Sequence, residues 1–110
     1  MTKVLVMLYK RSDLTWDEFA RYWRDIHGPL AVQLPGLRRY VENHSAEPGN
    51  PPYGVAELYF DRSDDFLAAI ASPEGKAALA DLSNFVDLER TGMTVVSEAL
   101  TVVPSPTTRE

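Results

Sequence analysis

The chain of 110 residues contains no cysteine, so disulfide bonds, thiolate nucleophiles and cysteine-ligated metals are excluded. Glycine is also sparse, with six residues, and none of them forms the glycine-rich loop that cradles phosphates in nucleotide-binding proteins. A nucleophile elbow and a paired-histidine metal motif are missing from the sequence as well. These absences leave hydrolase, kinase and dehydrogenase functions with little support.

Basic residues are outnumbered and scattered. There are 11 Lys and Arg against 16 Asp and Glu, which gives a formal net charge of −5. This balance disfavours nucleic acid and anionic membranes as partners. The apolar run Val4–Tyr9 is too short for a signal-peptide core or a membrane span, and Lys10 and Arg11 close it. We therefore expect a cytoplasmic protein.

Three aspartates near the middle of the chain, Asp61, Asp64 and Asp65, raise the question of a metal site. Acidic residues are also common at the start of a helix, where they cap backbone N–H groups. No histidine or glutamate stands at a ligand-like spacing from these three residues. Helix capping explains them better, and we predict no metal site.

The stretch Trp16–Tyr40 is the part of the chain around which the rest is organised. Thr15 followed by Glu18 is a capping box, which predicts that a helix begins at Trp16. Apolar side chains then recur at helical spacing and form one stripe: Trp16, Phe19, Trp23, Ile26 and Leu30.

A histidine follows on or beside this stripe. His27 lies roughly 40° around the helix from Trp23, so its ring is expected to face inward. Gly28 and Pro29 come next, and a glycine before a proline is typical of a helix end. We therefore expect a short break there and His27 at the C-terminal end of the helix.

The remaining segments alternate in a simple order. Strands are predicted at Lys3–Tyr9, Leu37–Ser45, Gly54–Asp61 and Met93–Val103. A second helix is predicted at Asp64–Ala71, and Ser72 with Pro73 restarts helix that ends near Asn84. The order strand, helix, strand, strand, helix, strand is the α+β, ferredoxin-like βαββαβ plan. We expect one domain over residues 1–103, a four-stranded antiparallel sheet with helices on one face, and a flexible tail over residues 104–110.

The first strand is apolar on both of its faces, but a helix layer covers only one face of a sheet. Leu5, Met7 and Tyr9 would then expose apolar area that monomers usually avoid. A twofold dimer in which the two bare faces meet would bury it. The long last strand, Met93–Val103, could also reach into the partner.

Residues Phe19–Tyr40, FARYWRDIHGPLAVQLPGLRRY, resemble the signature of the EthD family within the dimeric α+β barrel superfamily. The similarity continues through GVAELYFD and the Ser-Pro-Glu helix start, and the pairing of HGP with PGLRRY is its most specific part. The resemblance implies a homodimer whose sheets pack into a barrel, with an apolar pocket between sheet and helices. Relatives isomerise lactones, cyclise or oxidise polyketides, or have no assigned activity, and many need no metal or organic cofactor. It thus implies a fold more firmly than a reaction.

His27 is the first candidate for chemistry, because an imidazole accepts and donates protons near neutral pH. The alternative is a buried histidine bonded to a backbone carbonyl. The resemblance adds that the histidine of HGP is the usual pocket histidine of the family.

Tyr40 is the second candidate, since its hydroxyl could polarise a carbonyl or position a substrate. The resemblance to the methylmuconolactone isomerase branch implies that this tyrosine lies near the pocket histidine. The alternative is an edge-strand tyrosine that packs at the margin of the core. His44 shares a strand face with Tyr40, but its place beside a loop favours a solvated strand end.

Four further residues are predicted to contact a substrate. Trp23, Leu30 and Phe85 would line the cavity as apolar walls. Glu57 is a carboxylate in an otherwise apolar strand, and it would act as a base or orient an imidazole if it faces the pocket. If it faces the other way, it is an interface charge paired with an arginine.

Two functions remain open. The first is a small homodimeric, cofactor-independent enzyme in which His27 moves a proton on a small apolar carbonyl, phenol or lactone compound. Isomerisation, ring closure and oxygenation all fit this description. The second is a noncatalytic protein that carries a small apolar ligand or assists a catabolic or biosynthetic pathway. A ring nitrogen of His27 that is free and faces a cavity would favour the enzyme.

Overall fold

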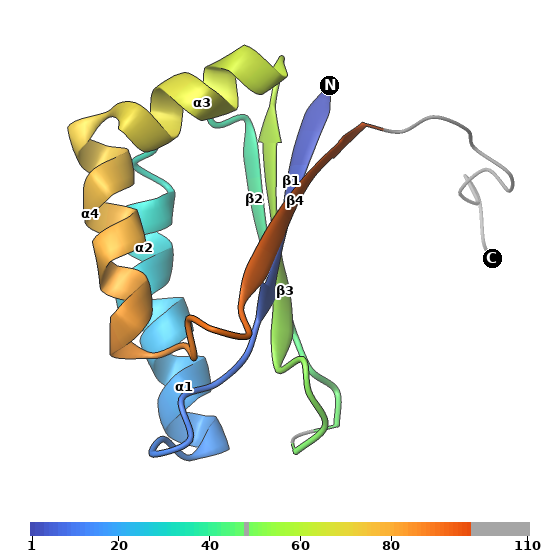
Figure 1. Cartoon of the computed structure of the whole chain (residues 1–110), viewed down its shortest axis with the longest axis vertical. Coiled ribbons are helices and arrows are strands. Elements are labelled where there is room, and N and C mark those ends of the chain that lie inside the picture. The colour runs from blue at the N-terminus through green and yellow to red at the C-terminus, as the bar shows by residue number, and fades with distance from the viewer. Residues whose placement is uncertain (48, 98–110) are drawn as a thin grey trace, which may run out of the picture.

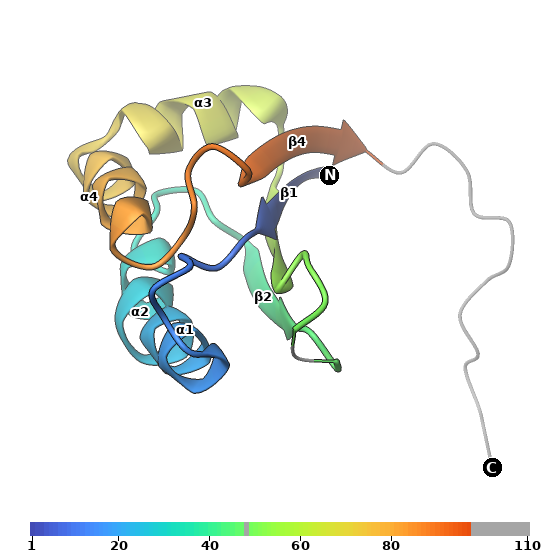
Figure 2. The same cartoon turned by 60° about the horizontal axis from the view of Figure 1, so that its bottom comes forward.

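The sheet has four antiparallel strands, and helices cover one of its faces (Figure 1). The computed structural model describes residues 1–47 and 49–97. Its strands, in the spatial order β2-β3-β1-β4, are β1 Thr2–Leu8, β2 Arg39–His44, β3 Gly54–Phe60 and β4 Gly92–Ser97. The predicted α+β class and ferredoxin-like element order are therefore confirmed. The turned view in Figure 2 shows the helices on the same side of the sheet.

The two central strands, β1 and β3, contribute most of the sheet's buried residues to the core. In β3 every second residue is buried, and Ala56, Leu58 and Phe60 point toward the helices. In the antiparallel register, Val4 of β1 lies opposite Leu58, while Leu5 lies opposite Glu57 on the other face. This alternation is the physical consequence of the two-residue period of a strand.

The first helical segment begins where the capping box predicts. The Thr15 side chain accepts a hydrogen bond from the Glu18 N–H, and the Glu18 carboxylate accepts one from the Thr15 N–H. α1 covers Trp16–Tyr22, and a π-helical turn, η1, covers Trp23–His27.

The predicted break at Gly28 is wrong. Gly28 has helical dihedrals, and α2 runs on over Gly28–Ala31 without a change of hand or a turn. Pro29 cannot donate a backbone hydrogen bond, and its ring crowds the carbonyl one turn earlier. The wide π-turn directly before it gives that carbonyl room, so helical backbone continues. His27 therefore lies inside a helical segment and not at its C-terminal end.

The second helical segment follows the prediction closely. α3 covers Ser63–Ala71 and α4 covers Pro73–Asp81, followed by the 3₁₀ turn η2 over Leu82–Asn84. Ser72 caps α4 by accepting from the Gly75 N–H at 3.0 Å. A side chain at Gly75 would meet the Ala69 carbonyl, so this glycine lets α3 and α4 approach closely.

The other face of the sheet is left uncovered in the single chain. Met7 is 36% exposed there, and Leu5 is partly exposed. β4 contains Gly92–Ser97, and the remainder of the predicted strand Met93–Val103 lies outside the described residues. The reach of that strand into a partner and the boundary between residues 103 and 104 therefore stay predictions. Within the described residues, no helix has the length and apolar character needed to cross a membrane.

Candidate functional site

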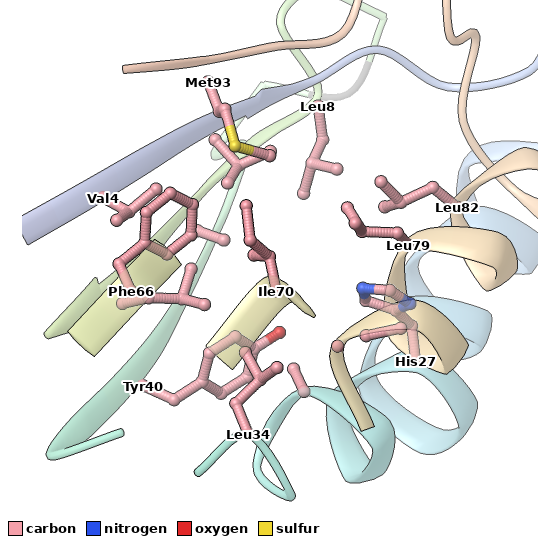
Figure 3. Close-up of a pocket in the computed structure, with 16 residues that line it drawn as sticks. Val4, Leu8, His27, Leu34, Tyr40, Phe66, Ile70, Leu79, Leu82 and Met93 are labelled. Carbon is pink, nitrogen blue, oxygen red and sulfur yellow. The ribbon is translucent and has the colours of Figure 1, made fainter. Parts of the chain in front are cut away.

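A small cavity of about 60 Å³ lies between the helix-covered face of the sheet and the helices (Figure 3). Its walls are almost entirely apolar, and among the described lining residues only His27 and Tyr40 carry an N–H or O–H group in the side chain. Leu79 of α4 and Met93 of β4 line it although they are 41% and 44% exposed, so they mark its opening. Other wall residues shown in Figure 3 are Val4, Leu8, Leu34, Phe66, Ile70 and Leu82.

His27 is held by a carboxylate from another helix. The residue is 8% exposed, and its Nδ1 lies 2.9 Å from Oδ2 of Asp81, the last residue of α4. The other oxygen of Asp81 accepts from the Tyr22 hydroxyl at 2.6 Å and from the Asn84 amide at 2.9 Å. Three donors from three elements therefore fix this carboxylate in place.

The protonation of this pair follows from its partners. Burial raises the pKa of Asp81, but the hydrogen bonds from Tyr22, Asn84 and His27 outweigh it, so the pKa lies below its usual value. An ionised carboxylate only accepts hydrogen bonds, so Nδ1 of His27 carries the proton. In the neutral imidazole Nε2 then carries the lone pair, and no hydrogen bond joins this atom to another of the described residues. Imidazole in this tautomer can accept a proton at Nε2.

Phe85 supports the histidine from outside the cavity. It is fully buried, with its ring centroid 4.9 Å from that of His27 and 5.1 Å from that of Tyr22. Its ring packs behind the His27–Asp81 pair, and so it restricts the orientation of the imidazole without lining the cavity.

Tyr40 reaches the same cavity from the sheet. In Figure 3 its hydroxyl points toward the side on which the His27 ring lies. The hydroxyl accepts from Trp23 Nε1 at 3.1 Å and donates to Oε2 of Glu42 at 2.8 Å. Burial raises the pKa of Tyr40, and the negative charge of Glu42 and the hydrogen bond to it raise it further. This residue therefore stays a neutral phenol.

Four side chains form a cluster around the Tyr40 hydroxyl. We call it the strand-edge cluster, and its members are Trp23, Tyr40, Glu42 and His44. Oε1 of Glu42 lies 2.9 Å from Nε2 of His44, and the His44 ring stacks on Trp23 with centroids 4.4 Å apart and planes 9° apart. His44 is therefore half-buried and packed, and the expected solvated strand end is wrong.

Two glycines make room for this cluster. A Cβ at Gly28 would lie 2.7 Å from Oε2 of Glu42, and a Cβ at Gly54 would clash with the Trp23 ring. Space and not backbone freedom therefore favours glycine at position 28, since its φ of −53° suits any residue.

The six predicted site residues do not all meet. His27 and Tyr40 line the cavity, whereas Trp23, Leu30 and Phe85 are not among its lining residues. Trp23 and Phe85 are both fully buried outside the cavity wall. Trp23 donates a hydrogen bond to Tyr40, and the Phe85 ring packs against His27.

Glu57 lies on the open face of the sheet, so its predicted contact with a substrate in this cavity is wrong. There it accepts from Asn43 Nδ2 at 2.8 Å and from the Tyr59 hydroxyl at 2.6 Å. The register of β3 decides this, because Glu57 alternates with the buried Ala56 and Leu58.

Asp81 and Glu42 were not predicted as site residues. Asp81 is 54 residues away from His27 in the sequence, and only the packing of α4 against α2 brings it close. Glu42 lies two residues after Tyr40 in β2 and so shares its strand face, which is the one sequence signal that could have identified it. Among the described residues, no group of three or more His, Asp or Glu side chains is arranged to hold a metal ion.

The EthD domain family model matches residues 11–89, which is most of the chain. The chain belongs to the EthD family. The chain is also 39% identical over 70 residues to an uncharacterized 11.0 kDa protein from the thcB–thcC intergenic region of Rhodococcus erythropolis, covering 61% of this chain and 68% of that protein.

Solved structures with the same fold include another EthD-family protein. That protein, from Bacillus halodurans, has a TM-score of 0.74 and 25% identity and covers 89% of this chain and 99% of its own. SnoaB, a cofactor-independent oxygenase from Streptomyces nogalater, has a TM-score of 0.69 and 14% identity, with coverage of 92% and 95%. A dimeric ferredoxin-like protein of unknown function from Bacteroides fragilis has a TM-score of 0.69 and 18% identity, with coverage of 88% and 95%. The EthD family and its fold are thus established for this chain, and its reaction is a separate question.

Proposed function

We propose that this EthD-family protein is a small homodimeric enzyme that works without a cofactor and uses His27 as a general base. Its substrate is a small, mainly apolar molecule with a carbonyl, phenol or lactone group. One observation carries the proposal: an imidazole lines an apolar cavity while its Nδ1 is bonded to the carboxylate of Asp81. That arrangement leaves Nε2 to meet a ligand.

The chemical step is a proton transfer. A substrate C–H or O–H bond breaks, the proton binds Nε2 of His27, and the electron pair stays on the substrate. The imidazolium that forms is stabilised by the charge of Asp81, which does not itself take the proton. Return of the proton to another atom gives isomerisation or ring closure. Reaction of the carbanion with dioxygen gives oxygenation, the reaction class named for the structural neighbour SnoaB.

The homodimer is part of this proposal because the uncovered sheet face needs a partner. Leu5 and Met7 lie on that face, and structural neighbours from Bacteroides fragilis and Thermobifida fusca are dimeric. Light scattering at micromolar protein is expected to give twice the mass of the chain. A monomeric mass would overturn this part.

Base strength is tested with 5-nitrobenzisoxazole, a small bicyclic molecule that opens to a coloured phenol when a general base removes its ring C–H proton. We expect the wild-type protein to accelerate this reaction and His27→Gln to lose the acceleration, by about 10²–10⁴-fold. Gln keeps a donor and an acceptor but exchanges no proton near neutral pH.

The matched control is His44→Gln, which alters the other histidine of the chain. His44 is bonded to a carboxylate at the same distance but does not line the cavity. We expect this variant to keep the activity. Equal losses in both variants, or no loss in a folded His27→Gln protein, would favour a noncatalytic ligand-binding role.

A further inference from the structure

The two polar side chains of the cavity wall both have their protons bound by other residues. Tyr40 has one O–H and two lone pairs on its hydroxyl. Trp23 Nε1 is a donor only, so it occupies one lone pair at 3.1 Å. Glu42, as a carboxylate, is an acceptor only, so it takes the O–H at 2.8 Å. One lone pair of Tyr40 is left for a ligand, and no proton.

The same count applies to His27. Its Nδ1–H is bound by Asp81 at 2.9 Å, and this carboxylate is held ionised by three donors. The atom left for a ligand is Nε2, which offers a lone pair. The cavity therefore presents two hydrogen-bond acceptors, on an otherwise apolar wall.

A ligand that brings only acceptors would place lone pairs against lone pairs in a buried site, and each unmade hydrogen bond has a cost. A ligand that brings a hydroxyl would satisfy them. We propose that this cavity selects small apolar molecules bearing a hydroxyl donor, such as phenols and enols, over ketones, lactones and ethers. Glu42 and Asp81 set this preference by binding the protons of Tyr40 and His27.

This inference rests on the proposed function and deepens it, because it selects one substrate class from carbonyl, phenol and lactone compounds. It also joins binding to the chemical step. A phenol hydroxyl bound at Nε2 has its proton where the base acts: the O–H bond breaks, the proton binds Nε2, and the electron pair stays on the oxygen as a phenolate.

The test compares three single-ring molecules of similar size, chosen because the cavity is small: p-cresol, 4-methylanisole and 4-methylcyclohexanone. The first donates a hydrogen bond and the other two only accept. Binding to the wild-type protein is measured by NMR titration. We expect p-cresol to bind about tenfold more tightly than either of the others, the worth of one hydrogen bond.

A preference for p-cresol of less than about threefold over either molecule would overturn the proposal. So would the absence of p-cresol binding at about 10 mM. The anisole is more apolar than the cresol, so burial of apolar area alone would give the opposite order.

Two measurements assign the preference to the named residues. In Glu42→Gln the side-chain amide can donate to Tyr40, which frees the Tyr40 proton for the cavity. We expect the preference for p-cresol over the ketone to fall at least about threefold in this variant. The matched control is Glu57→Gln, since Glu57 also accepts from a tyrosine hydroxyl, at 2.6 Å, but on the open sheet face. Equal effects in both variants would overturn the role of Glu42.

The tautomer of His27 is read directly from ¹⁵N chemical shifts of the wild-type protein. A proton on Nδ1 and a lone pair on Nε2 are expected, and the reverse tautomer would overturn the proposal. Measuring binding and turnover separately distinguishes the proposed donor preference from the proposed enzymatic function. Because 5-nitrobenzisoxazole brings no hydroxyl and is expected to bind weakly, its assay is run up to saturating concentration, so that kcat reports the base and not the affinity. Preferential binding of p-cresol without base catalysis at saturating benzisoxazole supports the donor preference and refutes the enzymatic role.

Discussion

Two histidine–carboxylate pairs of the same length occur in this molecule, and they do different things. His27 meets Asp81 and His44 meets Glu42, each at 2.9 Å. The first pair joins two helical segments and bonds through Nδ1, so that Nε2 remains available beside a cavity. The second lies along one strand, bonds through Nε2, and stacks its ring on Trp23. The comparison teaches that a short contact to a carboxylate does not make a base; the surroundings of the other ring nitrogen decide.

The largest effect is expected at Trp23, the indole on which the strand-edge cluster packs. Trp23 is fully buried, stacks on His44 and donates to Tyr40. Trp23→Ala should lower the free energy of unfolding by about 3–5 kcal/mol, because it leaves a large cavity and removes a donor. Urea unfolding measures this. A loss under about 1 kcal/mol would show that the strand-edge cluster does not depend on the indole.

Removing the carboxylate of each pair in turn should lower the free energy of unfolding by different amounts. Asp81→Ala leaves three donors without their acceptor, from Tyr22, Asn84 and His27, and should cost about 3 kcal/mol. Glu42→Ala should cost about 1 kcal/mol, because the Tyr40 hydroxyl can turn into the cavity. The two unfolding curves are compared at neutral pH, and the reverse order would contradict the assignment of the firmer network to Asp81.

Much of this comparison could not be predicted from the sequence. The capping box at Thr15, the alternation of β3 and the Ser72 cap use neighbouring residues, and all three appear as expected. The hydrogen-bond partners of His27 and Tyr40 could not be predicted in the same way. Asp81 reaches His27 only through the packing of one helix on another, which no local pattern records.

The face of Glu57 and the course of the helix at Gly28 show two further limits. Glu57 lies within an apolar strand, so its residue type alone fits either face, and the register decides. Gly28-Pro29 is typical of a helix end, but the π-turn before it removes the steric reason for stopping. Tertiary packing overrides local preference at both positions.

Acid should affect the first pair through Asp81. Its pKa is lowered in the folded protein, because the donors Tyr22, Asn84 and His27 outweigh the effect of burial. The stabilisation is therefore fully present above the unfolded pKa of about 4 and is lost as the pH falls through the lower folded value. We expect the stability difference between wild type and Asp81→Asn to shrink between about pH 5 and pH 2. Urea midpoints across this range measure it; a difference that grows toward acid would contradict the sign.

The smallest effect is expected at His44. His44→Phe keeps an aromatic ring on Trp23 but gives up the bond to Glu42, which is partly exposed to solvent. We expect a change of less than about 1 kcal/mol in unfolding free energy. The matched change His27→Phe, which places an apolar ring against the carboxylate of Asp81 at a buried position, should cost more than His44→Phe in the same thermal-melt comparison. Similar losses at both positions would remove the energetic distinction between the pairs.

The contact between Gly28 and Glu42 has a consequence for how sequences of this kind can change. A methyl group at residue 28 would lie 2.7 Å from Oε2 of Glu42, so the carboxylate would have to move away from Tyr40. Positions 28 and 42 are therefore coupled: a larger residue at the first calls for a shorter one at the second. A lineage could exchange a donor-binding cavity for a carbonyl-binding one by paired substitutions at positions 28 and 42, neither of which is among the residues lining the cavity.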